Sequence, residues 1–288
     1  VWDAKTKRLY GLNASGRSPE DLTLKYFHDN NYKKIPSLGP LPVSVPGCVD
    51  GWFELHSKFG KLPMHKILAP AINYANEGFP VTELIGYYFQ RSVPYLGSKF
   101  PNVLETYTVN GKAPSKGTIF KNPYLATTYS KLAKGGRDTF YKGEMAKTIV
   151  KFIKEQGGFL SYNDLASHKS EWVQPVSVNY RGFDVWELPP NGQGIAALQM
   201  LNIIEQYDFS NIEFGSAEHI HIVTEAKKLA FEDRAKYYAD MDFAKVPVEE
   251  LLDKEYAKSR KKLITNRAGK YNAGEISAGE TIYLTVAD

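Results

Sequence analysis

The chain has 288 residues, of which 43% are apolar and 24% are charged; this composition is typical of a folded globular protein and excludes a largely disordered one. Its net charge of +4 comes from 36 basic and 32 acidic residues spread along the chain, which argues against a dedicated nucleic-acid binder. No apolar run approaches the roughly 18 residues that a membrane span needs, and the length allows one large domain or two small ones.

The first half of the chain has mainly helical patterns. Turn-forming residues at 3–6 predict an opening hairpin, and Pro19 followed by two acidic residues predicts the first turn of a helix. A proline-rich stretch keeps the chain extended up to Gly47, after which a helix runs to Gly60. Further helices are predicted over 63–77, 81–96, 118–134 and 139–156, followed by a short capped helix from Ser161.

The second half adds strands to the helices. Residues 172–180 and 183–188 alternate around Arg181-Gly182, which predicts an antiparallel pair. Two long helices are predicted over 193–207 and 216–238, and a basic run over 258–267 is typical of a solvated helix face. Residues 282–287 alternate as in a buried strand. Helix dominates, so the predicted class is α+β, or a layered α/β fold whose sheet is incomplete here.

Two groups of polar side chains on the last long helix are candidates for a site. His219 and His221 are two residues apart, which points them about 200° apart on a helix and makes a shared metal ion unfavourable. Glu225, Glu232 and Asp233 have basic residues of the same helix within ion-pair reach. For both groups a structural role is the simpler interpretation.

Three further candidates lie outside that helix. Cys48 is the only cysteine, which excludes an intrachain disulfide, and its apolar neighbours predict a small buried hydrophobe rather than a nucleophile. The glycine-rich turn at 189–194 could present backbone N–H groups to an anion, but it matches neither common nucleotide-binding pattern. Arg17 precedes a helix in a loop, where a guanidinium suits a carboxylate, although a surface ion pair is the default.

Thr281 begins the terminal strand pattern. A threonine hydroxyl is a poor nucleophile at neutral pH unless a base takes its proton, and a threonine with a free α-amino group carries that base itself. Such a role requires a cut between Glu280 and Thr281. Judged on the residue alone, a structural role is the default.

Many short phrases, in collinear order over nearly the whole chain, resemble the large subunit of the γ-glutamyltransferase (glutathione hydrolase) family. They are Val45-Pro46-Gly47, Gly51, Phe59-Gly60, Leu62-Pro63, Pro70-Ala71-Ile72, Glu77-Gly78-Phe79, Phe140-Tyr141-Lys142-Gly143, Gly157-Gly158, Asp164-Leu165-Ala166, Tyr180-Arg181-Gly182, Pro189-Pro190, Gly215-Ser216-Ala217 and residues 225–234. The resemblance implies an N-terminal-nucleophile hydrolase, whose fold is an αββα sandwich, with only part of that sheet in this mostly helical segment.

The resemblance also implies a proenzyme that cuts itself before Thr281. Residues 1–280 would then be a large-subunit portion without its N-terminal part, and residues 281–288 the first strand of a small subunit whose remainder is missing. The implied reaction is γ-glutamyl transfer to an acceptor amine, or hydrolysis of γ-glutamyl amides such as glutathione. It requires no cofactor and no metal. The implied partners are a small-molecule γ-glutamyl substrate, an amine or water, and the chain's own small subunit, with no nucleic acid.

Two departures from the family pattern matter, one for the substrate and one for the nucleophile. The family's substrate-carboxylate arginine lies in an Arg-Glu-x-x-Pro context, where this chain has Ser15, with Arg17 two residues later. The Ser-Gly-Arg loop and the Asn-Gly-Gln-Gly turn are similar to the branch related to cephalosporin acylases. Ile282 follows Thr281 where many members have a second threonine, which leaves one candidate nucleophile. The alternatives are therefore an amide acylase of that branch, or a relative that never matures and acts as a non-catalytic binding module. The segment by itself is expected to be inactive, and its sequence does not indicate a cellular location.

Overall fold

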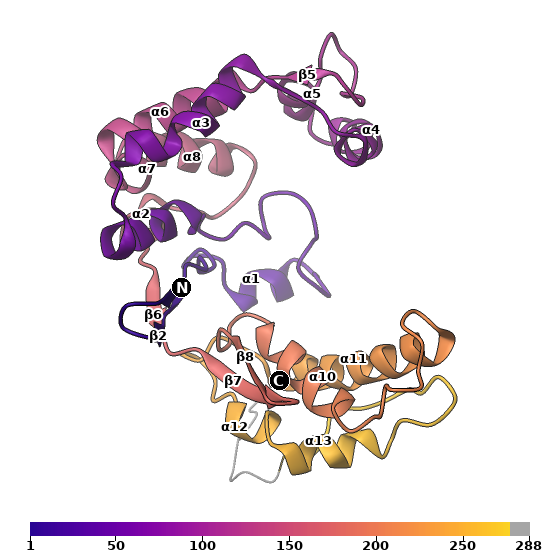
Figure 1. Cartoon of the computed structure of the whole chain (residues 1–288). Coiled ribbons are helices and arrows are strands. Elements are labelled where there is room, and N and C mark those ends of the chain that lie inside the picture. The colour runs from indigo at the N-terminus through magenta and orange to yellow at the C-terminus, as the bar shows by residue number, and fades with distance from the viewer. Residues whose placement is uncertain (277–288) are drawn as a thin grey trace. The chain divides into compact units, whose positions relative to one another are not determined.

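The structure is a computed structural model that describes residues 1–276, and it divides into two compact units (Figure 1). The central unit comprises residues 14–170. Among the described residues, the terminal unit comprises residues 1–13 and 171–276. Each unit has its own hydrophobic core. Of the helices in residues 1–276, none is long and apolar enough to cross a membrane.

The central unit is mainly helical, and its core forms where the longer helices pack. Helices α3 and α6 lie side by side (Figure 1). The core side chains Leu132, Tyr141 and Leu165 are almost completely buried, and each contributes about 1.5–3 kcal/mol relative to an exposed position. The elements are α1 (Leu24–Asp29), α2 (Cys48–Phe59), α3 (Met64–Glu77), β4 (Phe79–Pro80), α4 (Glu83–Gly97), α5 (Asn102–Tyr107), β5 (Ile119–Phe120), α6 (Pro123–Gly135), α7 (Asp138–Tyr141), α8 (Glu144–Glu155) and α9 (Tyr162–Ser167).

The first helix starts later than predicted. Residues 19–21 form a turn, and α1 begins at Leu24 with the side chain of Thr23 accepting a hydrogen bond from the Tyr26 N–H. The Glu20 N–H instead donates to Asp164 at 3.0 Å, so this part of the loop is tied to α9. The prediction from Pro19 was therefore wrong in its starting point: a tertiary contact holds this part of the chain as a loop, and the helix starts after the Thr23 cap.

Two further helix boundaries differ from the predicted ones. The segment predicted as a helix from residue 118 begins with strand β5, which pairs with β4 through Phe79 and Phe120, and α6 starts only after the Asn122 cap. The helix predicted over 139–156 is two helices, because the chain breaks at Lys142-Gly143 before α8 begins. The ends of α2 and α3 at glycine, the extent of α4 to within two residues and the Ser161 cap of α9 are confirmed.

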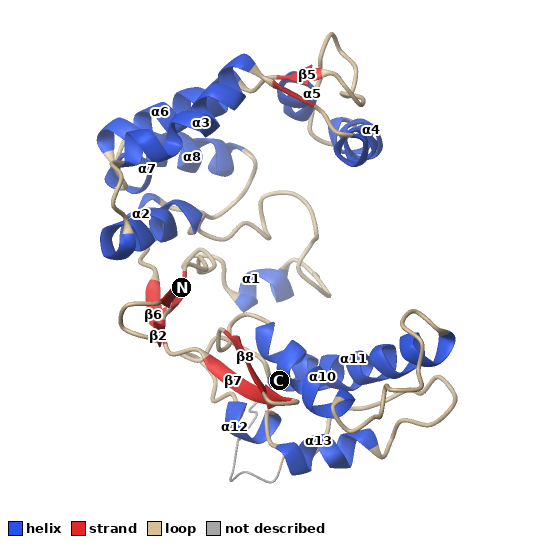
Figure 2. Cartoon of the chain, viewed as in Figure 1, coloured by secondary structure: helices blue, strands red, loops and turns tan. Residues whose placement is uncertain are grey.

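The terminal unit combines short strand pairs with four helices among its described residues. The opening hairpin is confirmed as β1 paired with β2, while β3 pairs with β6 and β7 with β8, all antiparallel. Figure 2 shows β7 and β8 as a hairpin beside α10. The elements are β1 (Trp2–Asp3), β2 (Arg8–Leu9), β3 (Gly11–Asn13), β6 (Glu171–Val173), β7 (Val176–Tyr180), β8 (Phe183–Glu187), α10 (Gly194–Ile204), α11 (Ala217–Tyr237), α12 (Val248–Leu251) and α13 (Lys254–Lys261).

The β7–β8 hairpin confirms the predicted antiparallel pair, with one change. Its turn places Arg181 at φ 52° and Gly182 at φ 91°, the left-handed pair that a two-residue hairpin turn requires. The first predicted strand, 172–180, is interrupted at Pro175. Its beginning forms β6, which pairs with β3 instead of β8. A proline cannot donate to a ladder, which explains the division.

Helices α10 and α11 form the core of the terminal unit and lie side by side (Figure 1). Ile195 and Leu198 of α10 pack with Val178 of the hairpin in one hydrophobic cluster. Leu229 of α11 packs with Ile203 of α10 in a second cluster. Both helices agree with the prediction to within a few residues at each end. With helices predominant and only two-stranded sheets among residues 1–276, the fold is α+β. The strand predicted over 282–287 lies outside the described residues.

Candidate functional site

Arg17 lies in the loop that connects β3 to α1, and its backbone is held by the turn before α2. The Val45 N–H donates to the Arg17 carbonyl oxygen at 2.9 Å. A Cβ atom on Gly16 would lie 1.6 Å from the Val45 oxygen, and one on Gly47 would lie 1.8 Å from the Ala14 oxygen. No side chain fits at either position, so both glycines are required by the close approach of the two segments. The Arg17 side chain itself is exposed, so a rigid backbone carries a guanidinium at the surface.

A buried tyrosine supports the turn at residues 45–47 from beneath. Tyr141 is fully buried, its hydroxyl donates to the Pro46 carbonyl at 2.6 Å, and it accepts from the Asp50 N–H at 3.0 Å. Burial raises the pKa of Tyr141 to about 12, so the hydroxyl stays protonated and able to donate at neutral pH. The phenol therefore joins the turn to the first residues of α2.

Asp50 and Arg137 form an ion pair beside this tyrosine. Asp50 is 2% exposed, accepts from the Ser170 N–H at 2.5 Å and pairs with the Arg137 guanidinium, which also donates to the His168 carbonyl. Burial alone would raise the pKa of Asp50, but the hydrogen bonds from Ser170 and Arg137 outweigh it and lower the pKa. The guanidinium carbon lies 4.5 Å from the centre of the Tyr141 ring. The pair thus links α2, α7 and the end of the central unit.

The imidazole of His168 completes this cluster. Its ring stacks on Tyr141 with 5.4 Å between centroids, and its Nε2 lies 3.9 Å from Asp50 Oδ2. A Cβ on Gly47 would come within 3.0 Å of the same nitrogen. Sequence reasoning missed these four residues as a group, because they are distant along the chain. The only signal was that Tyr141 lay within one of the family-like phrases.

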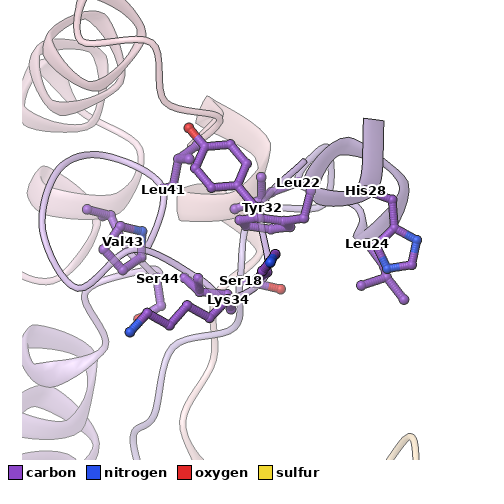
Figure 3. Close-up of a pocket in the computed structure, with 13 residues that line it drawn as sticks. Ser18, Leu22, Leu24, His28, Tyr32, Lys34, Leu41, Val43 and Ser44 are labelled. Carbon is purple, nitrogen blue, oxygen red and sulfur yellow. The ribbon is translucent and has the colours of Figure 1, made fainter. Parts of the chain in front are cut away.

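A pocket opens next to the Arg17 loop in the central unit. Its volume is about 620 Å³, and the residues that line it fall between Ser18 and Ser44 in the sequence. Ser18 follows Arg17, and Ser44 precedes Val45. Figure 3 shows that side chains of α1, including Leu24 and His28, approach it from one side and those of residues 41–44 from the other. The lining is mainly apolar, with cationic side chains from Lys33 and Lys34 but no carboxylate. It therefore suits an apolar or anionic group.

Cys48 is exposed, which corrects the prediction of a buried hydrophobe. It is the first residue of α2, and its neighbours Val49 and Asp50 take the buried positions instead. Partial burial raises the pKa of the Cys48 thiol, the opposite of what an activated nucleophile requires. Cys48 is thus not activated for nucleophilic attack.

The two histidines of α11 have separate surroundings. The ring of His219 contacts Phe209 and Phe214, whereas His221 Nε2 lies 2.7 Å from the Thr265 carbonyl oxygen. The structural interpretation agrees with these contacts. Within residues 1–276, no cluster of three or more histidine, cysteine, aspartate or glutamate side chains could hold a metal ion.

The loop 189–194 is a connection between β8 and α10, as predicted. Asn191 Oδ1 accepts a hydrogen bond of 2.9 Å from the side chain of Asn13 at the end of β3. A Cβ on Gly194 would lie 2.4 Å from the Glu187 carboxylate, so a carboxylate already occupies the approach to that helix start. This agrees with a tight turn rather than an anion site.

The carboxylates of α11 follow the predicted pattern only in part. Glu225 pairs with Lys228 of the same helix at 2.7 Å, as predicted. Asp233 instead pairs with Arg260 of α13 at 3.2 Å. Arg260 is 5% exposed, so the basic run at 258–267 is not simply a solvated helix face, and α13 ends at Lys261.

Glu280 and Thr281 lie outside the described residues, so the structure does not relate them to Arg17. The site that it does describe is the Arg17 loop, the turn at 45–47 and the buried cluster of Asp50, Arg137 and Tyr141 beneath them.

Comparison with known proteins identifies the family. The sequence matches the model of the family described as gamma-glutamyltranspeptidase over residues 1–288. The chain belongs to the gamma-glutamyltranspeptidase family. The structure is similar to the cephalosporin acylase of Bacillus halodurans, with a TM-score of 0.86 and 38% identity over 93% of this chain and 51% of that one. It is also similar to the gamma-glutamyltranspeptidase of Helicobacter pylori, with a TM-score of 0.84 and 27% identity over 100% of this chain and 83% of that one.

Curated relatives point to the same two activities. A glutathione hydrolase-like YwrD proenzyme from Bacillus subtilis is 38% identical over 88% of this chain and 48% of its own length. The acylase ACY 1 proenzyme of Pseudomonas sp. strain SE83 is 35% identical over 87% of this chain and 46% of its own length. The chain thus spans about half the length of these curated relatives. The family is one of enzymes, and the resemblance found in the sequence is confirmed, including its acylase side.

Proposed function

We propose that the protein is a proenzyme that divides itself between Glu280 and Thr281 and then transfers or hydrolyses γ-glutamyl groups. In this proposal residues 1–280 belong to the large subunit, and residues 281–288 begin the small one. For the cut, the Thr281 hydroxyl attacks the carbonyl carbon of Glu280, and the peptide nitrogen leaves as the new α-amine. Water then hydrolyses the resulting ester, which frees the Glu280 carboxylate and the hydroxyl.

Catalysis reuses the same hydroxyl. The Thr281 hydroxyl attacks the γ-carbonyl of a glutamyl amide, its own α-amine takes the proton, and that proton passes to the departing amine. A γ-glutamyl ester of Thr281 remains. Water then gives glutamate, or an acceptor amine gives a new amide, and either restores the hydroxyl. All bonds are exchanged at one carbonyl, so no redox partner or cofactor enters.

Arg17 is assigned to the α-carboxylate of the glutamyl group. The support is local: an exposed guanidinium on a backbone that Val45, Gly16 and Gly47 hold in place. A guanidinium binds a carboxylate through two parallel hydrogen bonds, which orients a substrate only if the arginine has a rigid base. The loop meets that condition.

The observation that carries the proposal is the family match over residues 1–288, a range that includes Glu280 and Thr281. In addition, the two relatives described above are named as proenzymes. Mass spectrometry of the full-length protein tests it. The expected result is two chains, the second with Thr281 at its N-terminus, and hydrolysis of a γ-glutamyl anilide. A single uncut chain would instead support a non-maturing binding module.

A second candidate, an amide acylase using the same nucleophile, is favoured by the likeness to the cephalosporin acylase and by the Ser15-Gly16-Arg17 loop. A glutaryl amide has the same side-chain length as a γ-glutamyl amide but no α-amino group. Comparing kcat/KM for the two amides separates the candidates: a preference for the glutaryl amide would favour the acylase.

A further inference from the structure

Helix α11 has two buried carboxylates that neither the Arg17 site nor the proposed chemistry uses. Glu225 is 2% exposed and Asp233 is 1% exposed. Burying an ionised carboxylate is costly unless several donors satisfy its oxygens. Three of the donors in this case, Gly269, Tyr271 and Gly274, come from one stretch of chain, residues 265–274, which follows α13 and leads toward Glu280. We call this stretch the arm.

Glu225 binds the first part of the arm. Its Oε2 accepts from the Gly269 N–H at 2.9 Å and from the Tyr271 hydroxyl at 2.5 Å, and Lys228 pairs with its Oε1. Burial would raise the pKa of Glu225, but these hydrogen bonds outweigh it and hold the pKa at about 2. The carboxylate is therefore a charged acceptor under all physiological conditions.

Asp233 binds the end of the arm. Its Oδ1 accepts from the Gly274 N–H at 2.8 Å, and its Oδ2 accepts from the Tyr256 hydroxyl at 2.9 Å and from the Gln199 side chain at 3.0 Å. Arg260 closes the charge balance and also donates to the Asn272 carbonyl of the arm at 2.8 Å. A Cβ on Gly274 would lie 2.1 Å from the Tyr256 hydroxyl, so a larger residue there would displace the hydroxyl that donates to Asp233.

Two further contacts lie on either side of Glu225 and Asp233 along the helix, and they follow the order of the arm residues. His221 lies 2.7 Å from the Thr265 carbonyl oxygen at one end, and the Tyr237 hydroxyl donates to the Gly274 carbonyl at 2.6 Å at the other. From His221 to Tyr237 the helix rises about 24 Å, which an extended arm of this length covers. Beyond the arm, Ile276 packs against the apolar cluster around Ile195.

We propose that Glu225 and Asp233 are positioning residues for maturation. They hold the arm along α11 and so anchor the chain that leads to the peptide bond between Glu280 and Thr281. The inference rests on the proposed function. Its physical basis is orientation: the Thr281 hydroxyl must face the neighbouring Glu280 carbonyl, and a chain that is anchored upstream limits how this peptide can turn away. Ile276 lies 5 positions before Thr281, whereas the end of α13 lies 20 positions before it.

Release of the arm removes this restraint on orientation. The proposal therefore expects slower cleavage when contacts are removed near both ends of the arm.

The test uses the full-length protein with the double substitution Glu225→Gln and Tyr237→Phe. The matched control is Glu205→Gln with Tyr162→Phe. Glu205 pairs with Lys254 in the same unit, and the Tyr162 hydroxyl donates to the Lys142 carbonyl at 2.8 Å, but neither residue contacts the arm. The conversion of one chain to two is followed on a denaturing gel after a pulse of synthesis, and kcat is measured on the matured fraction.

The expected result is slower conversion in the arm variant alone, with kcat of the matured fraction equal to wild type. Equal conversion rates in the arm variant and wild type would overturn the inference while leaving the proposed function intact. An uncut wild-type chain would remove both. If the double variant does not fold, Tyr271→Phe, which deletes one phenol donor to Glu225, provides the same comparison: slower conversion supports the inference, and an unchanged rate overturns it.

Discussion

Gly47 and Ala14 approach so closely that a Cβ on the glycine would lie 1.8 Å from the alanine carbonyl oxygen. This contact joins the turn before α2 to the loop that carries Arg17. The reciprocal contact, between Gly16 and the Val45 oxygen, makes the two backbones a single support. The position of the Arg17 backbone therefore depends on residues of the turn at 45–47.

Gly47→Ala tests this support. The new methyl group would overlap the backbone carbonyl of Ala14. Because backbone atoms cannot rotate away as a flexible side chain does, the two segments must separate. We expect a lower melting temperature and a higher KM for a γ-glutamyl substrate. Gly192→Ala is the matched control, since its Cβ meets nothing within 4 Å. Equal effects of the two substitutions would contradict the account of the contact.

Arg17→Ala tests the proposed carboxylate contact directly. Loss of a charge-assisted hydrogen bond costs about 1.5–3 kcal/mol, which corresponds to a rise in KM of about tenfold or more. Arg17→Lys should recover only part of the loss, because an ammonium cannot form the paired hydrogen bonds. The measurement is KM for a γ-glutamyl anilide on matured enzyme. If KM stays unchanged in the alanine variant, Arg17 does not bind the substrate.

Asp50→Asn tests the buried cluster. Removing one partner of a buried ion pair costs about 3–5 kcal/mol, because the other charge is left buried without compensation. Asp138 also contacts Arg137 but is exposed, so Asp138→Asn should cost less than about 1 kcal/mol. Urea unfolding of both variants measures the two costs. Similar losses of unfolding free energy in the two variants would contradict the assignment of Asp50 as the main partner of Arg137.

The pKa of Glu225 predicts a pH dependence. It is lowered from 4.5 to about 2, so the carboxylate contributes stability that is fully present above about pH 4.5 and is lost as the pH falls toward 2. Glu225→Gln lacks this contribution. We expect the difference in melting temperature between wild type and the variant to be constant above about pH 5 and to shrink below it. A difference that does not change with pH would exclude the ionised carboxylate as its source.

The elements that were predicted well carry their signals locally. Helix α11 has the Ser216 cap at one end and apolar residues such as Ala226 and Leu229 on its buried face, and the β7–β8 hairpin has Arg181-Gly182 at the turn. The boundaries that were missed depend on distant partners. Asp164 captures the Glu20 N–H, and β4 pairs with residues that read as the start of a helix. No local pattern reports such contacts.

The candidate site divides in the same way. Arg17 and the turn at 45–47 could be proposed from the sequence because loops and family-like phrases mark them. The Asp50–Arg137 ion pair and the hydrogen bond from Gly274 to Asp233 could not be proposed from the sequence, because each joins residues far apart in the chain. Cys48 was misjudged because apolar neighbours in sequence do not determine which side of a helix start faces the solvent.

The central claim is that Thr281 divides the chain and then performs the chemistry. Its most direct test is Thr281→Ala in the full-length protein, analysed by denaturing gel and mass spectrometry beside wild type. The account predicts two chains for wild type, with Thr281 at the new N-terminus, and one inactive uncut chain for the variant. Two chains from Thr281→Ala would contradict it.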